Sequence, residues 1–285
     1  MDNILEETKF IMNKYNIKAN KSLGQNFLIN EDVVKEIVES SQIEADDLVI
    51  EIGPGLGTLT KFLLEKAKKV VCIELDSKMI RILEDRFKLY DNLEIKNEDV
   101  LKVDLQKLIK DEKERSNVKN VKIVANLPYY ITTPIIMKLL EEKLDLESIT
   151  VMIQKEVADR LIAIPGDKDT GAITYTVNYY SIGEKIIEVS NNSFIPEPEV
   201  TSEVIKLTIR KNPPVQVINI ELMFKIIKNA FMQRRKTLLN SLYNSKIFKS
   251  KEKGIEILKE VGLDQNIRAE KLTLQDFANI ADKIL

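Results

Sequence analysis

The 285-residue sequence contains no histidine and no tryptophan, and its one cysteine is Cys72. Without imidazole the commonest general base is absent, as are Ser/His and Cys/His nucleophile systems and most catalytic zinc sites. A single cysteine cannot form an internal disulfide, which fits a reducing compartment. We therefore expect a cytoplasmic protein whose chemistry works without imidazole.

Long apolar runs are also missing. None approaches the roughly 20 residues that a membrane span needs, and the N-terminal MDNILEETKF is acidic rather than an apolar signal core. The net charge of −2 argues against a protein that coats nucleic acid with its whole surface, although it leaves room for a local basic face. The sequence predicts a globular chain with no membrane partner.

The sequence is organised around the stretch Leu48 to Thr58, LVIEIGPGLGT. Four apolar residues in positions 48–52 are typical of a central strand that is covered on both faces. Gly53, Gly55 and Gly57 then allow close approach of the backbone to a ligand, and a helix follows from Thr58. Such a turn lies where open α/β sheets bind ligands, so a nucleoside-type cofactor is the first hypothesis.

The glycine spacing narrows this hypothesis. A dinucleotide fingerprint requires a glycine at the sixth position of the turn, where this chain has Thr58. A triphosphate-binding loop ends in Gly-Lys-Ser/Thr, and this turn lacks that ending. The pattern G-x-G-x-G favours S-adenosylmethionine. A dinucleotide site and a purely structural glycine turn stay open as alternatives.

Two acidic residues follow later strands. Glu74 ends the strand predicted over 70–75, about 20 residues after Gly53, which is where a βαβ unit delivers a carboxylate to ribose hydroxyls. Asp99 follows the strand predicted over 93–96, and there a carboxylate could accept a hydrogen bond from the exocyclic amine of an adenine. Either residue could instead be a solvated strand end or a turn cap.

The strand predicted over 121–125 delivers Asn126, Leu127, Pro128 and Tyr129. The proline ends strand pairing and fixes the backbone, so the carbonyl groups have defined directions. An amide, fixed carbonyls and an aromatic ring suit a clamp that orients the weakly nucleophilic amine of adenine and stacks on its base. No strong base is required, in agreement with the absence of histidine.

The remaining pattern predicts an α/β domain over 1–211 and a helical domain over 212–285, divided near Asn212-Pro213-Pro214. Helices are expected over 33–43, 58–67, 77–89 (capped by Ser77) and 133–142, and from 155; strands over 149–154, 185–189 and 203–209; a helix or loop over 171–178; and a charged surface connection over 106–120. An N-terminal arm with amides at Gln25 and Asn26 is either a lid over the cofactor or a docked extension. Phe194, in a rigid Pro-containing loop, is either a core residue or a second stacking ring.

Positions 225–253 hold nine basic residues against one acid. A charge run is usually a solvated helical face, but its isolation in a mildly acidic chain favours phosphate binding. The residues singled out for RNA contact are Arg234, Arg235 and Lys236.

The segments KSLGQNFL, VIEIGPGLGTLT, CIELD, EDVL, VANLPYYITTPI, FIPEPEVTS and FMQRRKTLLNSL occur in this order and together resemble the ribosomal RNA adenine dimethyltransferase family, from about Asn20 to the C-terminus. The resemblance is strongest to its small-subunit, kasugamycin-resistance branch. It implies a Rossmann-like methyltransferase domain with a smaller all-helical C-terminal RNA-binding domain. It also implies S-adenosylmethionine as donor, no metal, and dimethylation of two adjacent adenosines in the 3′-terminal hairpin of 16S rRNA, late in assembly of the small ribosomal subunit or its precursor.

By the same resemblance, the donor would be held by Asn26, Leu28, Gly53, Gly55, Glu74, Asp99 and Asn126, and the target base by Asn126, Leu127, Pro128, Tyr129 and Phe194. We expect the chain to act as a monomer. Two alternatives remain: a large-subunit (23S) rRNA methyltransferase of the macrolide-resistance type, which usually carries Ile after the clamp Asn and has a shorter C-terminal part, and an assembly factor whose rRNA binding matters more than catalysis.

Overall fold

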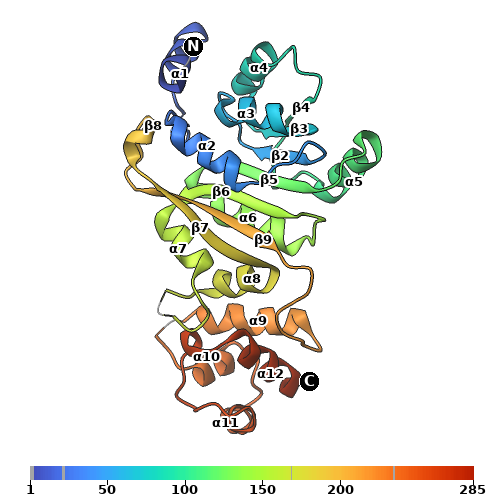
Figure 1. The fold of residues 1–285 in the computed structure, drawn as a ribbon. Helices are drawn as coiled ribbons and strands as arrows, with labels where there is room; N and C mark the ends of the chain where they lie inside the picture. The colour runs from blue at the N-terminus through green and yellow to red at the C-terminus, as the bar shows by residue number, and fades with distance from the viewer. Residues whose placement is uncertain (1–2, 21–22, 168, 234) are drawn as a thin grey trace. The chain divides into compact units, whose positions relative to one another are not determined.

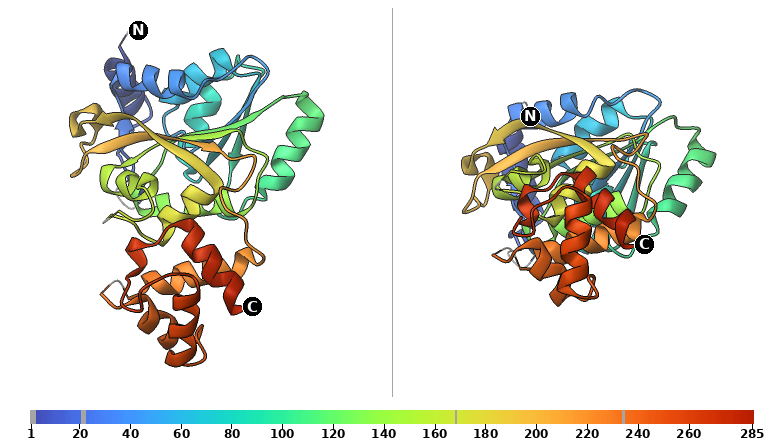
Figure 2. Two further views of the ribbon diagram at one scale, coloured as in Figure 1. Left: turned by 60° about the horizontal axis from the view of Figure 1, so that its bottom comes forward. Right: turned by 90° about the horizontal axis from the view of Figure 1, so that it is seen from below.

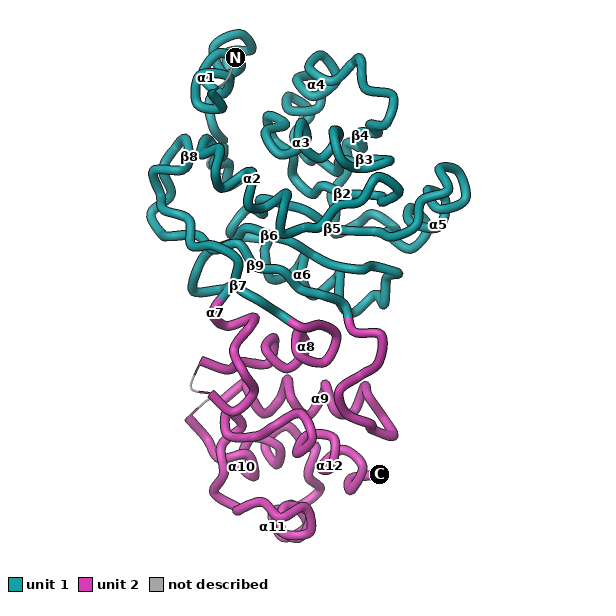
Figure 3. Tube along the Cα trace, viewed as in Figure 1, with its two compact units in different colours: residues 1–158, 183–209 teal, residues 159–182, 210–285 magenta. Residues whose placement is uncertain are grey.

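The computed structural model describes residues 3–20, 23–167, 169–233 and 235–285. They form two compact units, coloured separately in Figure 3: residues 1–158 with 183–209, and residues 159–182 with 210–285. No helix in the described part of the chain is both long and apolar enough to cross a membrane.

The first unit is built on a seven-stranded sheet of order β4-β3-β2-β5-β6-β9-β7 (Figure 1). Its strands are β2 (Leu48–Ile52), β3 (Lys69–Glu74), β4 (Leu93–Asn97), β5 (Val121–Asn126), β6 (Ser148–Gln154), β7 (Ser181–Val189) and β9 (Ser202–Ile209). The first five pair in parallel, and β9 is antiparallel to β6. The strand order reverses at β2, the first strand of this sheet along the chain, and its parallel neighbours are β3 and β5. The predicted Rossmann-like fold is confirmed.

The helices of this unit occur in the order that the sequence predicts, apart from the N-terminal helix and the helix between β4 and β5, which the sequence did not predict. They are α1 (Ile4–Lys14), α2 (Glu31–Ser40), α3 (Thr58–Lys66), α4 (Ser77–Arg86), α5 (Leu105–Ser116), α6 (Thr132–Glu141) and α7 (Lys155–Ile162), with short 3-10 turns η2 (Tyr129–Ile131) and η3 (Asn191–Ser193). The main core joins apolar residues of α2 and α3 to strand residues such as Val49, Val70 and Val124. Residues 48–52 are buried throughout, as expected of a central strand.

Two local predictions for this unit are wrong. The N-cap of α4 is Asp76, whose side chain accepts a hydrogen bond from Lys78 N, and not Ser77. The charged segment 106–120 is largely helical, because Leu108 and Ile109 are buried on one face of α5 while most of its charged residues face solvent.

The second unit is helical and contains α8 (Ala172–Tyr180), α9 (Ile220–Phe231), α10 (Leu238–Asn244), α11 (Lys251–Glu260), α12 (Leu274–Ile284) and the 3-10 turn η4 (Ala269–Lys271). Figures 1 and 2 show α9 to α12, orange to red, gathered in one group. Tyr175 and Tyr179 of α8 belong to the same apolar core as Phe277 of α12. The expected domain over 1–211 therefore loses residues 159–182 to the helical unit, since the side chains of α8 complete that unit's core.

Candidate active site

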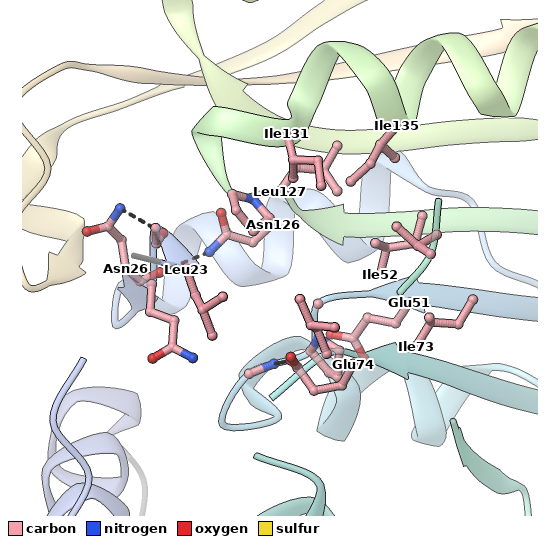
Figure 4. Close-up of a pocket in the computed structure, with 18 of the residues that line it drawn as sticks. Leu23, Asn26, Glu51, Ile52, Ile73, Glu74, Asn126, Leu127, Ile131 and Ile135 are labelled. Atoms are coloured by element: carbon pink, nitrogen blue, oxygen red, sulfur yellow. Dashed lines mark hydrogen bonds between the residues drawn. The ribbon is translucent and has the colours of Figure 1, made fainter. Parts of the chain in front are cut away.

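A pocket opens at the carboxyl ends of β2, β3 and β5 (Figure 4). It contains every residue predicted to hold the donor and four of the five predicted to hold the target base: Asn26, Leu28, Gly53, Gly55, Glu74, Asp99, Asn126, Leu127, Pro128 and Tyr129. These residues come from segments up to about 100 positions apart in the chain. The parallel arrangement of the strands brings them to one edge of the sheet.

The glycine turn between β2 and α3 forms the floor of this pocket. Gly53 N donates to Ile73 O at 2.9 Å, which ties the turn to the end of β3. Gly57 has a φ of +83°, and a Cβ there would lie 2.5 Å from Phe87 Cε2. Glycine is required at this position both for the backbone conformation and for the close approach of α4.

Glu74 is held at the mouth of the turn. Its side chain is largely buried, its Oε2 accepts from Gly55 N at 3.1 Å, and its Oε1 accepts from Asp76 N at 2.8 Å. Burial raises the pKa of Glu74, and the backbone hydrogen bonds from Asp76 and Gly55 oppose that rise. Each carboxylate oxygen keeps a further lone pair, so this group fits the hydroxyls of a ribose without giving up its structural bonds.

Asp99 lines the same pocket beyond β4. Its Oδ1 accepts from Leu101 N at 3.0 Å, and its Oδ2 lies 3.7 Å from Lys102 Nζ. Asp99 therefore caps the turn, which was the alternative role suggested by the sequence, and it also lines the pocket. The neighbouring Glu98 is a lining residue that the sequence analysis did not single out.

The segment from Asn126 to Tyr129 begins at the last residue of β5, across the pocket from the glycine turn. Asn126 Nδ2 donates to Asn26 O at 3.2 Å, whereas no described residue donates to Asn126 Oδ1. The carbonyl of Pro128 accepts from Ile131 N at 3.2 Å and from Thr132 Oγ1 at 3.1 Å. Since Pro128 O is already bonded, Asn126 Oδ1 and Leu127 O are the acceptors that this turn can offer to an amine.

Tyr129 is half-buried in the pocket wall, and its hydroxyl lies 2.6 Å from Ser202 Oγ at the start of β9. Burial raises the pKa of Tyr129, so the phenol is neutral at physiological pH. Ser202 fixes the ring and was not predicted as a site residue. It is the last residue of the FIPEPEVTS segment, where only spatial proximity reveals its role.

The N-terminal arm closes one side of the pocket. Gln25 Nε2 donates to Asp76 Oδ2 at 3.0 Å, and a Cβ at Gly24 would lie 3.3 Å from the ring of Tyr130. Phe27–Leu28 (β1) pairs with Phe194–Ile195 (β8) in a small antiparallel sheet. The arm contacts Asn126 through the main-chain carbonyl of Asn26, and the Asn26 side chain turns back toward Gly24 O at 3.4 Å.

Phe194 is not brought into the pocket. Its side chain is 1% exposed and belongs to the main apolar core, which is the core alternative that the sequence left open. The geometry of this structure gives it no surface on which a base could stack.

Glu51 is a pocket residue that the sequence analysis missed. It lies inside the buried strand β2, its side chain is 1% exposed, and its Oε2 accepts from Thr60 Oγ1 at 2.6 Å. Burial raises the pKa of Glu51 to about 7, and the hydrogen bonds from Thr60 and Cys72 oppose that rise only in part. The signal in the sequence was a single acid within an otherwise apolar strand.

The predicted RNA contacts belong to the helical unit. Arg235 and Lys236 are exposed, and Arg234 lies outside the described residues. Within the described chain, one acidic group, Glu44, Asp46 and Asp47, is close enough to share a cation. None of its residues lines the pocket, and Asp47 there is paired with Lys122 at 2.7 Å.

Comparison with known proteins identifies the family. Residues 16–285 match the family model described as "Ribosomal RNA adenine dimethylase". A relative from Alkaliphilus metalliredigens, named ribosomal RNA small subunit methyltransferase A, is 49% identical over 100% of this chain and 99% of its own. A relative of the same name from Clostridioides difficile is 48% identical over 97% of this chain and 94% of its own.

A solved structure gives the same result for the fold. The crystal structure of a dimethyladenosine transferase from Plasmodium falciparum superposes with a TM-score of 0.75 at 27% identity, covering 89% of this chain and 95% of that one. The family match includes the glycine turn, the acidic strand ends and the Asn126–Tyr129 segment. This chain belongs to the ribosomal RNA adenine dimethylase family.

Proposed function

We propose that this chain dimethylates N6 of two adjacent adenosines in the 3′-terminal hairpin of 16S rRNA, with S-adenosylmethionine as donor, late in small-subunit assembly. Adenine dimethylation of ribosomal RNA as the reaction class follows from membership of the family. The small-subunit substrate is favoured by the names of the relatives, and the 23S alternative is not.

The residues of the pocket suit this donor. Glu74 would accept hydrogen bonds from the ribose hydroxyls, Asp99 from the adenine amine, and the glycine turn would allow the backbone to approach closely. Asn26, Leu28, Gly53, Gly55 and Asn126 would complete the contacts, because all of them line the same pocket. The donor supplies an electrophilic methyl group carried on a sulfonium. We expect the transfer to need no metal.

The chain's own groups orient the nucleophile. The lone pair of adenine N6 is delocalised into the ring, so Asn126 Oδ1 and Leu127 O would accept hydrogen bonds from its two N–H groups and direct the nitrogen toward the methyl group. The ring of Tyr129, held by Ser202, would stack on the base. The N–C bond would form as the S–CH3 bond breaks, so the leaving group would be a neutral thioether. The proton lost from the methylated nitrogen would go to solvent, and no imidazole is needed for it.

The helical unit would supply RNA contacts. Arg235 and Lys236 are exposed, and most neighbouring basic residues on α9 to α11 face solvent as well. Local positive charge binds phosphate with release of counterions, so this surface would hold the RNA backbone without reading its sequence. We expect a monomer that acts in the cytoplasm.

The observation that carries this proposal is the bond between Asn126 Nδ2 and Asn26 O, 3.2 Å long, within one pocket that also contains Glu74. This bond uses the amide nitrogen of Asn126, so the amide oxygen would remain to accept a hydrogen bond from the target amine. We therefore expect Asn126→Ala to abolish methylation while small subunits still bind. Asn13→Ala, an exposed Asn-to-Ala change on α1, serves as the matched control.

The assay incubates each variant with labelled donor and small subunits that lack the modification, and then maps the methylated adenosines after digestion. Large subunits are tested in parallel. Methyl transfer by Asn126→Ala at the wild-type rate would refute the role of Asn126 in orienting the amine. Label on 23S rRNA would show that the substrate is the large-subunit RNA. A methylation-dead variant that still supports subunit maturation would favour the assembly-factor alternative.

A further inference from the structure

Arg86, the last residue of α4, connects the glycine turn to the N-terminal helix. Its side chain is 12% exposed. One guanidinium nitrogen donates to the main-chain carbonyl of Leu56, and the other donates to Glu7 Oε1 on α1 at 2.5 Å. Leu56 stands between Gly55 and Gly57, so this bond holds the turn at its centre.

The same end of α4 supports the turn by packing. A Cβ at Gly57 would lie 2.5 Å from Phe87 and 2.9 Å from Leu83, which flank Arg86 in the sequence. The three residues Leu83, Arg86 and Phe87 therefore approach the turn together. Because a backbone carbonyl in a turn has no strand or helix partner of its own, the planar guanidinium is the group that fixes its direction.

The N-terminal helix reaches the turn through the same residues. Ile11 of α1 shares a small apolar cluster with Phe27 of the arm, Leu56 of the turn and Met79 and Ile82 of α4. Glu7 of α1 is bonded to Arg86 and also lies 3.5 Å from Lys61 Nζ on α3. Helix α1 is thus tied by charge to both helices that flank the glycine turn.

We propose that Arg86 is a positioning residue for the donor-binding turn, and that Glu7 makes α1 part of this support. Neither residue lines the donor pocket, so both act through the position of Leu56 and its neighbouring glycines. The proposal rests on the proposed function, because it assumes that the turn binds S-adenosylmethionine. It predicts weaker donor binding with unchanged chemistry once the donor is bound.

The test compares Arg86→Gln with Arg81→Gln, the same change at an exposed position of the same helix. S-adenosylmethionine binding is measured by calorimetry, and the KM values for donor and for small subunits and the kcat are measured by methyl transfer. We expect Arg86→Gln to raise the donor Kd and KM about tenfold, or about 1.4 kcal/mol. The kcat at saturating donor and the KM for subunits should stay within about twofold of wild type.

Two further variants separate positioning from a general structural role. Arg86→Lys offers a compact cation in place of the fork and should restore part of the lost affinity. Glu7→Gln should weaken donor binding less than Arg86→Gln, and it should add less than its full effect in the Arg86→Gln background, because part of its action passes through Arg86 and the rest through Lys61. Circular dichroism and thermal unfolding accompany each variant.

An Arg86→Gln protein that is folded and binds the donor as tightly as Arg81→Gln overturns the proposal. So does a Glu7→Gln effect that adds in full to that of Arg86→Gln. If Arg86→Gln does not fold, Arg86→Lys and Glu7→Gln decide, and wild-type donor affinity in both overturns it. Failure of the wild-type chain to bind the donor would instead refute the proposed function.

Discussion

Stability should depend on pH through Glu51, which lies in the buried strand β2 with its side chain 1% exposed. Burial raises the pKa of Glu51 from 4.5 to about 7, and the hydrogen bonds from Thr60 and Cys72 offset part of that rise. Between these two values the folded state keeps the proton and the unfolded state has released it. The free energy of unfolding therefore falls as pH rises through this window.

The size of the effect follows from the two pKa values. One pKa unit corresponds to about 1.4 kcal/mol, so a rise of roughly 2.5 units costs about 3 kcal/mol by pH 8. Above pH 7 the carboxyl is ionised in both states, and its contribution becomes constant. Glu51→Gln keeps the shape of the side chain but cannot ionise, so it removes this loss.

We expect Glu51→Gln to gain about 2.5 kcal/mol of stability relative to wild type as pH rises from 5 to 8, because the rest of the difference develops below pH 5. Unfolding by urea is followed at constant ionic strength, with hydrogen exchange of β2 and β3 amides to report on the first unit. The window is free of histidine titration because the chain has no histidine.

Glu65→Gln, the same change at an exposed position of α3, should keep the wild-type pH dependence. If the curves of Glu51→Gln and wild type run parallel from pH 5 to 8, the burial argument for Glu51 is refuted. If Glu51→Gln instead loses stability relative to wild type as pH rises, the folded state stabilises the carboxylate.

Two further predictions concern packing and charge. Lys122→Met should lower the free energy of unfolding by about 3–5 kcal/mol in urea titrations, because Asp47 is 0% exposed, lies 2.7 Å from Lys122 Nζ and would keep only uncharged donors. Adding Asp47→Asn to that variant should restore most of the loss, and no recovery would contradict the reasoning. Gly57→Ala should destabilise more than Gly262→Ala, by about 1–3 kcal/mol, and should weaken donor binding. Both glycines have positive φ, but only a Cβ at Gly57 meets Phe87 and Leu83. Equal losses of stability in the two variants would mean that backbone strain explains the whole effect and that the contact with Phe87 and Leu83 contributes nothing.

Much of the fold was predictable because its signals are local. Buried parallel strands produce continuous apolar runs such as residues 48–52, and helices have a different period, so their order along the chain is readable. The domain boundary was wrong because tertiary packing decides it. Helix α8 belongs to the helical unit because Tyr175 and Tyr179 complete that unit's core, and no local signal in residues 159–182 indicates this.

The grouping of the glycine turn, the acidic strand ends and Asn126 around one pocket was predictable for a similar reason. The glycine turn, Glu74, Asp99 and Asn126 all lie at or within two residues of a strand end, and parallel strands place their carboxyl ends at one edge of the sheet. Phe194 has no such constraint. Its position depends on pairing of Phe194–Ile195 with Phe27–Leu28, which turns its ring into the core.

The sequence by itself determined the fold class, the order of the sheet strands and most residue types of the pocket, because these follow from local periodicity and from the ends of strands. Only the tertiary structure decided which groups touch. It joined Asn126 to Asn26, Tyr129 to Ser202, and Arg86 to Leu56. Contacts between residues 30 to 100 positions apart depend on how the whole chain packs, and no short stretch of sequence contains that information.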